Sequence, residues 1–356
     1  MKKPRNILIF GASYGSLLGM KLALAGHSVK LVCLPDEARL INQEGAIVRL
    51  PVKGREGLLE INSRQAAGQL SACGTTEANP GDYDLVALAM QEPQYPAPGV
   101  RTLLDAVAKS KVPCMSIMNM PPLPYLKRIP AIHADSCRSA YTDATVWDGF
   151  DPAQMTLCSP DPQAFRPPGE NPNILQVRLP TNFKVARFDS EASTALLREL
   201  EADIEAIRFE TEGGAIALPV KLKVYDSPFV PLAKWAMLVT GNYRCVQKDS
   251  MRTIAEAVLG DLEISRATYD WVVQVCLAAG AQVEDMVPFE KYAAAAQGLN
   301  SPSSAARALF GGAPNIERVD RLVRTIAAQF GMKSRVLDEV VTLIDNRLEL
   351  NRQHVA

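Results

Sequence analysis

Residues 6–34 read NILIFGASYGSLLGMKLALAGHSVKLVCL, and this stretch decides the fold of the chain. The apolar run ILIF predicts a buried strand, SLLGMKLALAG has the apolar spacing of a helix, and SVKLVCL predicts a second strand. Gly26 stands where a C-terminal helix cap is expected. Together these segments form a βαβ unit, whose turn aims backbone N–H groups and the positive end of the helix dipole at one place. We therefore predict that a pyrophosphate binds at this turn.

The glycine spacing departs from the dinucleotide pattern G-x-G-x-x-G, because Gly11, Gly15 and Gly19 recur at every fourth position. Small residues stand where the middle glycine is expected, and they still let a phosphate approach. We expect a larger side chain at Gly15 to fill the space that the pyrophosphate needs. The alternative is a glycine turn that only packs a helix on a sheet. The residues expected to contact the dinucleotide are Gly11, Ala12, Ser13, Tyr14 and Gly15.

The composition is that of an ordinary globular protein with enough residues for two cores. Of the 356 residues, 47% are hydrophobic and 22% are charged. The formal net charge of −1 gives no electrostatic reason for binding nucleic acid or an anionic membrane. No apolar run approaches the ~20 residues of a membrane span. A signal peptide is disfavoured because the apolar N-terminal stretch is interrupted by polar residues and continues into a strand. We expect a cytoplasmic protein that acts on a small molecule.

Cysteine and histidine offer little chemistry in this sequence. The seven cysteines are scattered and form no C-x-x-C motif, so neither a zinc site nor a disulfide framework is predicted. The three histidines have no metal-binding or triad partner nearby in the sequence, so a general acid based on histidine is not expected.

The order of predicted elements indicates an α/β chain with two domains. Strands at residues 81–91 and 112–119 flank a helix at 100–111, which predicts an N-terminal Rossmann-type doubly wound sheet. Residues 121–180 are rich in Pro, Asp and Gly and predict short strands, as an antiparallel extension of the sheet. Everything beyond residue 231 has helical spacing. We predict a Rossmann-type domain at residues 1–215, an all-helical domain at 216–356, and a cleft between them.

Three groups of polar residues are candidates for the site. Gln91 and Asn119 follow predicted strands, at the sheet edge where ligands of such folds bind. Lys234 lies in an otherwise apolar helix, at a four-residue spacing that places it on one face with Leu238 and Asn242. A lysine there either lies along the surface or points into the cleft. Ser304 opens a later helix, where a capping role needs no functional explanation.

At this point the sequence resembles the ketopantoate reductase family (2-dehydropantoate 2-reductases). The opening IFGASYGSLLGMKLALAGHSVKLV is similar to the family's GAGAIGSLLGAKLALAGHDVTLV, and DLVALAMQ, IMNM, the Lys234 helix and a Ser-Ser…Gly-Gly segment follow in the family's order. The resemblance implies a Rossmann domain, a helical domain and NADPH-dependent reduction of a 2-oxo acid. It implies that Lys234 is the catalytic proton donor, that Asn242 and Ser304 bind substrate, and that Asn119 holds the nicotinamide ribose.

The chain departs from the family at several of these positions. Leu238 replaces an Asn of the family, and Gln91 replaces a Lys. Ile316 occupies the position where the family has a Glu, although Glu317 is adjacent. An apparent insertion at residues 218–229 precedes the lysine helix. We therefore expect a substrate other than ketopantoate.

The cofactor and the wider class of the protein stay open in part. Leu34 occupies the place of the Arg that grips the 2′-phosphate of NADP, with Arg39 as the nearest substitute, whereas Asp36 would favour the ribose of NAD. We expect NADP, with NAD as the alternative, and leave a homodimer open. The rival functions are an opine-type dehydrogenase and a non-catalytic redox sensor that binds dinucleotide; the presence of Lys234 speaks against the sensor.

Overall fold

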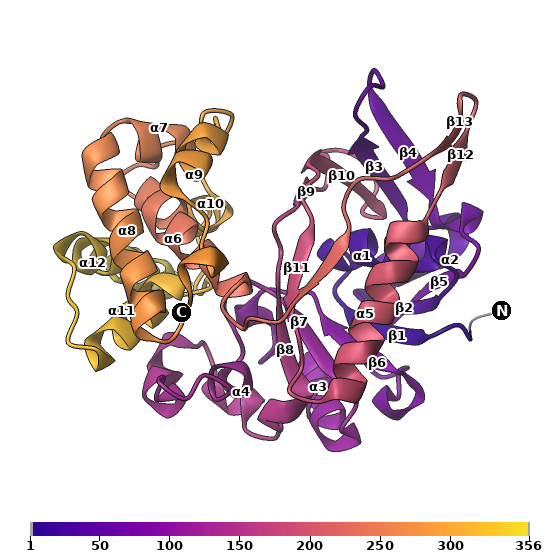
Figure 1. The fold of residues 1–356 in the computed structure, drawn as a ribbon, viewed down its shortest axis with the longest axis horizontal. Coiled ribbons are helices and arrows are strands. Elements are labelled where there is room, and N and C mark those ends of the chain that lie inside the picture. Colours follow the sequence, from indigo (N-terminus) through magenta and orange to yellow (C-terminus); the bar gives the residue numbers. More distant parts are fainter. Residues whose placement is uncertain (1–2, 355–356) are drawn as a thin grey trace. The chain divides into compact units, whose positions relative to one another are not determined.

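The computed structural model describes residues 3–354, which form two compact units (Figure 1). The sheet unit contains the chain up to Met90, Gln94–Met118 and Val146–Asp226. The helical unit contains Gln91–Pro93, Asn119–Thr145 and the chain from Ser227 onward. The chain thus passes between the units several times, whereas the sequence predicts one division, between residues 215 and 216. The predicted domain boundary between residues 215 and 216 stays a prediction.

The sheet unit is built on eight strands, and the predicted Rossmann-type sheet is confirmed. Their spatial order is β14-β11-β8-β7-β6-β1-β2-β5, and the six strands from β8 to β5 all run parallel. The antiparallel extension predicted for residues 121–180 is wrong, because β8 joins this sheet in parallel and β9 and β10 belong to another sheet. The antiparallel strand is β11, beyond that range; it runs antiparallel to β8, and β14 then pairs with β11 in parallel. The strands are β1 (Asn6–Phe10), β2 (Ser28–Val32), β5 (Gln69–Cys73), β6 (Leu85–Leu88), β7 (Cys114–Ile117), β8 (Met155–Ser159), β11 (Phe183–Ala186) and β14 (Leu222–Tyr225).

Both faces of this sheet are covered, as a parallel sheet requires. Ile7 and Ile9 share a core with α1 and α5, while Leu8 and Phe10 alternate to the opposite face and are equally buried. Gly26 has φ +93 and ends α1 as predicted. The helices of this unit are α1 (Tyr14–Leu24), α2 (Pro35–Glu44), α3 (Pro98–Ser110) and α5 (Glu191–Ala206).

Smaller sheets complete the sheet unit. Strands β4 and β5 were not predicted from the sequence. The segment expected as an insertion, 218–229, supplies the edge strand β14, and the buried Lys21 of α1 holds it by donating a hydrogen bond to the Pro219 carbonyl. The remaining strands are β4 (Leu58–Asn62), β3 (Ile47–Pro51), β10 (Ile174–Leu179) and β9 (Gln163–Phe165) in one sheet, and β12 (Phe209–Thr211) with β13 (Gly214–Ile216) in a hairpin.

The C-terminal part of the chain is helical, which confirms the predicted helical domain type. The helical spacing across residues 255–280 belongs to two helices: α7 ends at Leu259, and Asp261 caps a new helix by accepting from Ile264 N at 2.9 Å. Within residues 3–354 no helix is long and apolar enough to cross a membrane. The helices are α4 (Leu123–Leu126), α6 (Lys234–Met237), α7 (Ile254–Leu259), α8 (Leu262–Ala278), α9 (Phe289–Ala296), α10 (Ser304–Phe310), α11 (Val319–Gln329) and α12 (Arg335–Gln353).

The glycine turn between β1 and α1 is shaped by the sheet it rests on. Gly11 has φ +88, and a Cβ there would lie 2.9 Å from the Ala89 carbonyl oxygen. A Cβ on Gly15 would lie 2.9 Å from Cγ2 of Ile9 in β1. The expected reason for a glycine at position 15 is therefore wrong, because a larger side chain there would enter the core and not the space of a pyrophosphate. The contact between the turn and a dinucleotide stays a prediction.

We predict that Gly15→Ala destabilises the fold by about 1–3 kcal/mol, because the added methyl group overpacks the interface between α1 and β1. Urea unfolding followed by circular dichroism measures this change. Ser13→Ala is the matched control, since the half-buried Ser13 makes no capping hydrogen bond within the described chain. A Gly15→Ala protein as stable as the control would show that the turn does not set the position of α1.

Candidate functional site

Lys234 lies at the start of a helix that changes its winding almost at once. Helix α6 ends at Met237, and residues Leu238–Asn242 form a π-helical turn. Such turns are rare and frequently occur at functional sites. The π turn widens the winding after Lys234, and the expectation that Lys234, Leu238 and Asn242 share one face stays a prediction. Lys234 and Asn242 are half-buried, whereas Leu238 is buried.

A tyrosine from another helix contacts the π turn. The buried Tyr292 of α9 donates its hydroxyl to the Met237 carbonyl at 3.0 Å. The same hydroxyl lies directly against Gly241, where a Cβ would overlap it. Its ring stacks on Tyr269 of α8 with centroids 5.5 Å apart. The turn between Lys234 and Asn242 is thus held from outside by a fixed aromatic side chain.

Glu317 brings together residues from three parts of the helical unit. Its carboxylate accepts from Asn119 Nδ2 at 3.1 Å and, at a longer 3.5 Å, from the Glu92 amide. The buried Tyr243 donates its hydroxyl to the Glu317 carbonyl at 2.6 Å and accepts from Val319 N at 3.1 Å. This pair of bonds fixes the backbone that carries the carboxylate.

The charge of Lys234 acts on the same carboxylate. Burial raises the pKa of Glu317, while the hydrogen bond from Asn119, the amides of Glu92 and Met120, and the positive charge of Lys234 lower it. The sequence prediction left Glu317 as a one-residue alternative to Ile316. Ile316 is 4% exposed and belongs to the core, so Glu317 is the residue placed near the lysine.

Glu92 is the residue that sequence reasoning missed. It has 0% exposure, and its carboxylate accepts from Thr142 N and Thr142 Oγ1, both at 2.9 Å. The pKa of Glu92 is raised to about 7, chiefly by burial and also by the charge of Glu317, against the lowering effect of the Thr142 bonds. The one available signal was its position directly after Gln91, at the end of a buried strand. Gln91 itself is exposed.

Ser303 connects the two predicted substrate residues Asn242 and Ser304. Ser303 is buried, donates its hydroxyl to the Asn242 carbonyl at 2.7 Å and caps α10 through Ala306 N at 3.1 Å. Ser304 follows as the exposed first residue of α10. Ser303 therefore has a structural role, and the side chains of Asn242 and Ser304 stay candidates for binding.

Two features fit a nicotinamide dinucleotide, each within its own unit. In the sheet unit, α1 begins at the glycine turn, and the first turn of a helix has amides without intrahelical acceptors. In the helical unit, the bond to Glu317 fixes the orientation of the Asn119 amide, and its buried Oδ1 has no hydrogen-bond partner among residues 3–354. A ribose hydroxyl is a donor that such an oxygen can accept. No cluster of metal-ligating side chains occurs in the described residues.

The segment after β2 has no arginine at the position where ketopantoate reductases bind the 2′-phosphate of NADP. Leu34 is 75% exposed, and Asp36 pairs with Arg39 at 3.0 Å. Glu37 is buried and pairs with Arg166. An acidic residue near this strand end is typical of NAD sites, and an arginine is typical of NADP sites. The segment contains one of each kind, Asp36 and Arg39.

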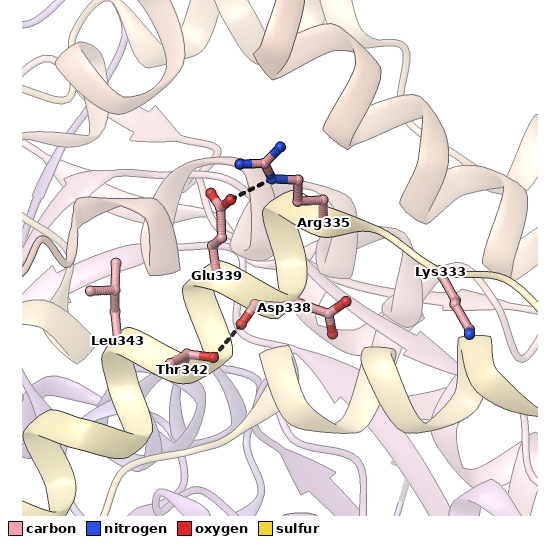
Figure 2. A pocket seen from close by; sticks show the side chains of 6 residues that line it. All are labelled: Lys333, Arg335, Asp338, Glu339, Thr342 and Leu343. Atoms are coloured by element: carbon pink, nitrogen blue, oxygen red, sulfur yellow. Dashed lines mark hydrogen bonds and ion pairs between the residues drawn. The ribbon is translucent and has the colours of Figure 1, made fainter.

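A surface hollow of about 670 Å³ lies on α12, away from the predicted site residues in the sequence (Figure 2). Its side chains pair among themselves, with Arg335 donating to Glu339 at 2.8 Å. None of the predicted site residues lines it. The lining residues are Lys333, Arg335, Asp338, Glu339, Thr342 and Leu343.

Comparison with solved structures identifies the fold over nearly the whole chain. A candidate ketopantoate reductase from Ralstonia solanacearum MolK2 has a TM-score of 0.68 at 14% identity, covering 98% of this chain and 99% of that chain. D-mandelate dehydrogenase with NADH and anilino(oxo)acetate has a TM-score of 0.62 at 15% identity, with coverage of 98% and 99%. A dimeric ketopantoate reductase from Staphylococcus aureus has a TM-score of 0.60 at 9% identity, with coverage of 97% and 99%.

Comparison by sequence gives no such match: no family model matches the chain, and no curated protein is detectably similar to it in sequence. The structural matches confirm the resemblance noted from the sequence at the level of the fold. Fold does not settle chemistry, which has to be argued from the site.

We predict that Gly241→Ala destabilises the protein by about 1–3 kcal/mol, because the new methyl group overlaps the Tyr292 hydroxyl. Tyr292→Phe alone loses one hydrogen bond, worth about 1 kcal/mol. The double variant should recover part of the Gly241→Ala loss, because removing the hydroxyl makes room for the methyl group. Urea unfolding of the four proteins measures this coupling. Strictly additive losses would contradict the account of the π turn.

Proposed function

We propose, from the ketopantoate reductase fold and the residues around Glu317, that this chain is an NAD(P)H-dependent oxidoreductase that reduces a 2-oxo acid or a related ketone. The observation that carries the proposal is the charge of Lys234 acting on the Glu317 carboxylate, which Asn119 also binds. This arrangement also supports an enzyme over a redox sensor, since a sensor needs no proton donor. The alternative is an opine-type dehydrogenase, which joins the same domain types.

The nicotinamide ring, when bound, supplies the hydride for the carbonyl carbon. The glycine turn would hold the pyrophosphate, and the free Oδ1 of Asn119 would accept from the ribose. Lys234 would give its proton to the developing alkoxide as the general acid. Glu317 would keep the ammonium group in place and charged until that moment. Asn242, Ser304 and Gln91 would orient the substrate.

The substrate is proposed to have an apolar arm. Gln91 and Leu238 replace groups that in ketopantoate reductases are a Lys and an Asn, whereas Glu317 compensates for the third departure, Ile316. D-mandelate dehydrogenase, a structural neighbour, acts on a 2-hydroxy acid with an aromatic arm. A 2-oxo acid with an aromatic or branched aliphatic arm fits this pattern.

NADP stays the proposed cofactor, with NAD as the alternative. The D-mandelate dehydrogenase neighbour was solved with NADH, which supports a nicotinamide dinucleotide without deciding its phosphate. A homodimer is an option in view of the dimeric ketopantoate reductase with this fold. The cytoplasmic location stays a prediction from the sequence.

We predict that Lys234→Ala slows turnover by ~10² or more, the low end for general acid catalysis, while dinucleotide binding stays nearly intact. Stopped-flow oxidation of NADPH and NADH measures the first, and a fluorescence titration measures the second. Lys333→Ala, which removes an exposed lysine of the α12 hollow, is the control and should match the parent protein. Parental turnover in Lys234→Ala would remove the lysine from the mechanism.

We predict that ketopantoate is a poor substrate. Each lost hydrogen bond to a charged group is worth about 1.5–3 kcal/mol, so the two departures at Gln91 and Leu238 cost roughly 3–6 kcal/mol. That corresponds to a loss on the order of 10²–10⁴ in kcat/KM. Steady-state kinetics should show better values with phenylglyoxylate, the 2-oxo acid related to mandelate.

Gln91→Lys combined with Leu238→Asn is the matching gain-of-function variant, and it should improve kcat/KM for ketopantoate selectively. A parent protein with kcat/KM for ketopantoate of about 10⁴ M⁻¹s⁻¹ or above would refute the prediction, because that value lies in the ordinary range of enzymes.

A further inference from the structure

Glu92 contacts Glu317 while its own carboxyl group is enclosed by protein. Its backbone amide donates to Glu317 Oε1 at 3.5 Å, and its side chain is fully buried against Thr142. The two acidic residues come from distant parts of the sequence, and both belong to the helical unit. The charge of the half-buried Glu317 acts on the fully buried Glu92, so the two carboxyl groups do not ionise independently, because each negative charge disfavours the other.

The partners of the two carboxyl groups differ in charge. Glu317 has the amide of Asn119, two backbone N–H groups and the positive charge of Lys234. Glu92 has the amide and hydroxyl of Thr142 and the backbone N–H of Asp143, which are all neutral donors. Of the two, Glu317 is therefore the one that is better stabilised as an anion.

The groups that face Glu92 reinforce this assignment. The buried Tyr141 lies within its electrostatic reach and already donates its hydroxyl to the Pro121 carbonyl at 2.6 Å. Among the charged side chains, Glu317 acts electrostatically on Glu92, and Lys234 acts on Glu317. Lys234 stabilises the charge of Glu317, and only neutral groups donate to Glu92, so the proton that the pair retains near neutral pH resides on Glu92.

We propose that Glu92 is a positioning residue, which carries the proton of this carboxyl pair so that Glu317 remains an anion beside Lys234. The inference rests on the proposed function for its catalytic meaning, but the protonation of the pair is a property of the protein without substrate. When the pH rises above neutrality, Glu92 releases its proton to solvent and adds a second negative charge next to Glu317. The pair then repels, and the position of Glu317 relative to Lys234 is disturbed.

The first experiment needs no substrate. Carboxyl ¹³C NMR of protein labelled at its glutamates should show two signals, from Glu92 and Glu317, that respond together near pH 7. Glu92→Gln identifies the Glu92 signal by its loss and should abolish the response of the Glu317 signal in that range. Persistence of a Glu317 response near pH 7 in Glu92→Gln would overturn the proposal.

Two further variants keep the test valid if Glu92→Gln does not fold. Glu92→Asp retains a carboxyl group and should retain the coupled response at a shifted pH. Thr142→Val removes a hydrogen bond that favours the ionised form, so the response should move to higher pH by roughly 0.7 unit, the equivalent of about 1 kcal/mol. An unshifted response in Thr142→Val would also overturn the proposal.

The kinetic experiment separates this inference from the proposed function. With a 2-oxo acid that the parent protein reduces, the profile of kcat/KM against pH should fall above an apparent pKa near 7, and Glu92→Gln should lack this limb. A merely structural role for Glu92 would lower activity at every pH and leave the limb in place. If no 2-oxo acid is reduced but the coupled NMR response is present, the proposed function fails and the carboxyl pair stands.

Discussion

The carboxylate of Glu317 is the constraint on which the helical unit depends. A carboxylate taken out of water costs several kcal/mol unless donors and a cation replace its hydration. Here the donors come from Asn119 and from backbone amides far away in the sequence, and the cation is Lys234. Segments that share no secondary structure are therefore held in one place. Tyr243 completes the arrangement by fixing the Glu317 carbonyl.

The local fold was predictable because its signals are local. The βαβ unit could be identified from apolar spacing and one glycine cap, and the helices of the C-terminal half from their period. The prediction erred where a distant residue decides. Tyr292 contacts the π turn at Met237 and Gly241 from α9, and no spacing within the lysine helix reveals this contact. Gly15 was assigned to a ligand, although the core explains it.

The candidate site was predictable to the extent that single positions match a family pattern. Lys234 and Asn119 were chosen in this way, and both act on Glu317. The choice between Ile316 and Glu317 needed the structure, since a one-residue shift reverses which side chain faces the core. Glu92 belongs to no pattern at all. A buried acid becomes visible only when its surroundings are known, because the same residue in a loop is ordinarily solvated.

The route of the chain has a consequence for recombination between related genes. Gln91–Pro93 and Asn119–Thr145 belong to the helical unit although the sheet unit surrounds them in the sequence. A crossover after residue 226 that exchanges the helical half would bring a foreign Lys234 and Glu317, yet leave Glu92 and Asn119 of the original parent. In such a hybrid, Lys234 would come from one parent, whereas the donors to Glu317, which are the Asn119 side chain and the Glu92 amide, would come from the other. The residues around Glu317 must therefore be inherited together, because exchanging the C-terminal half alone would separate the carboxylate from its original donors.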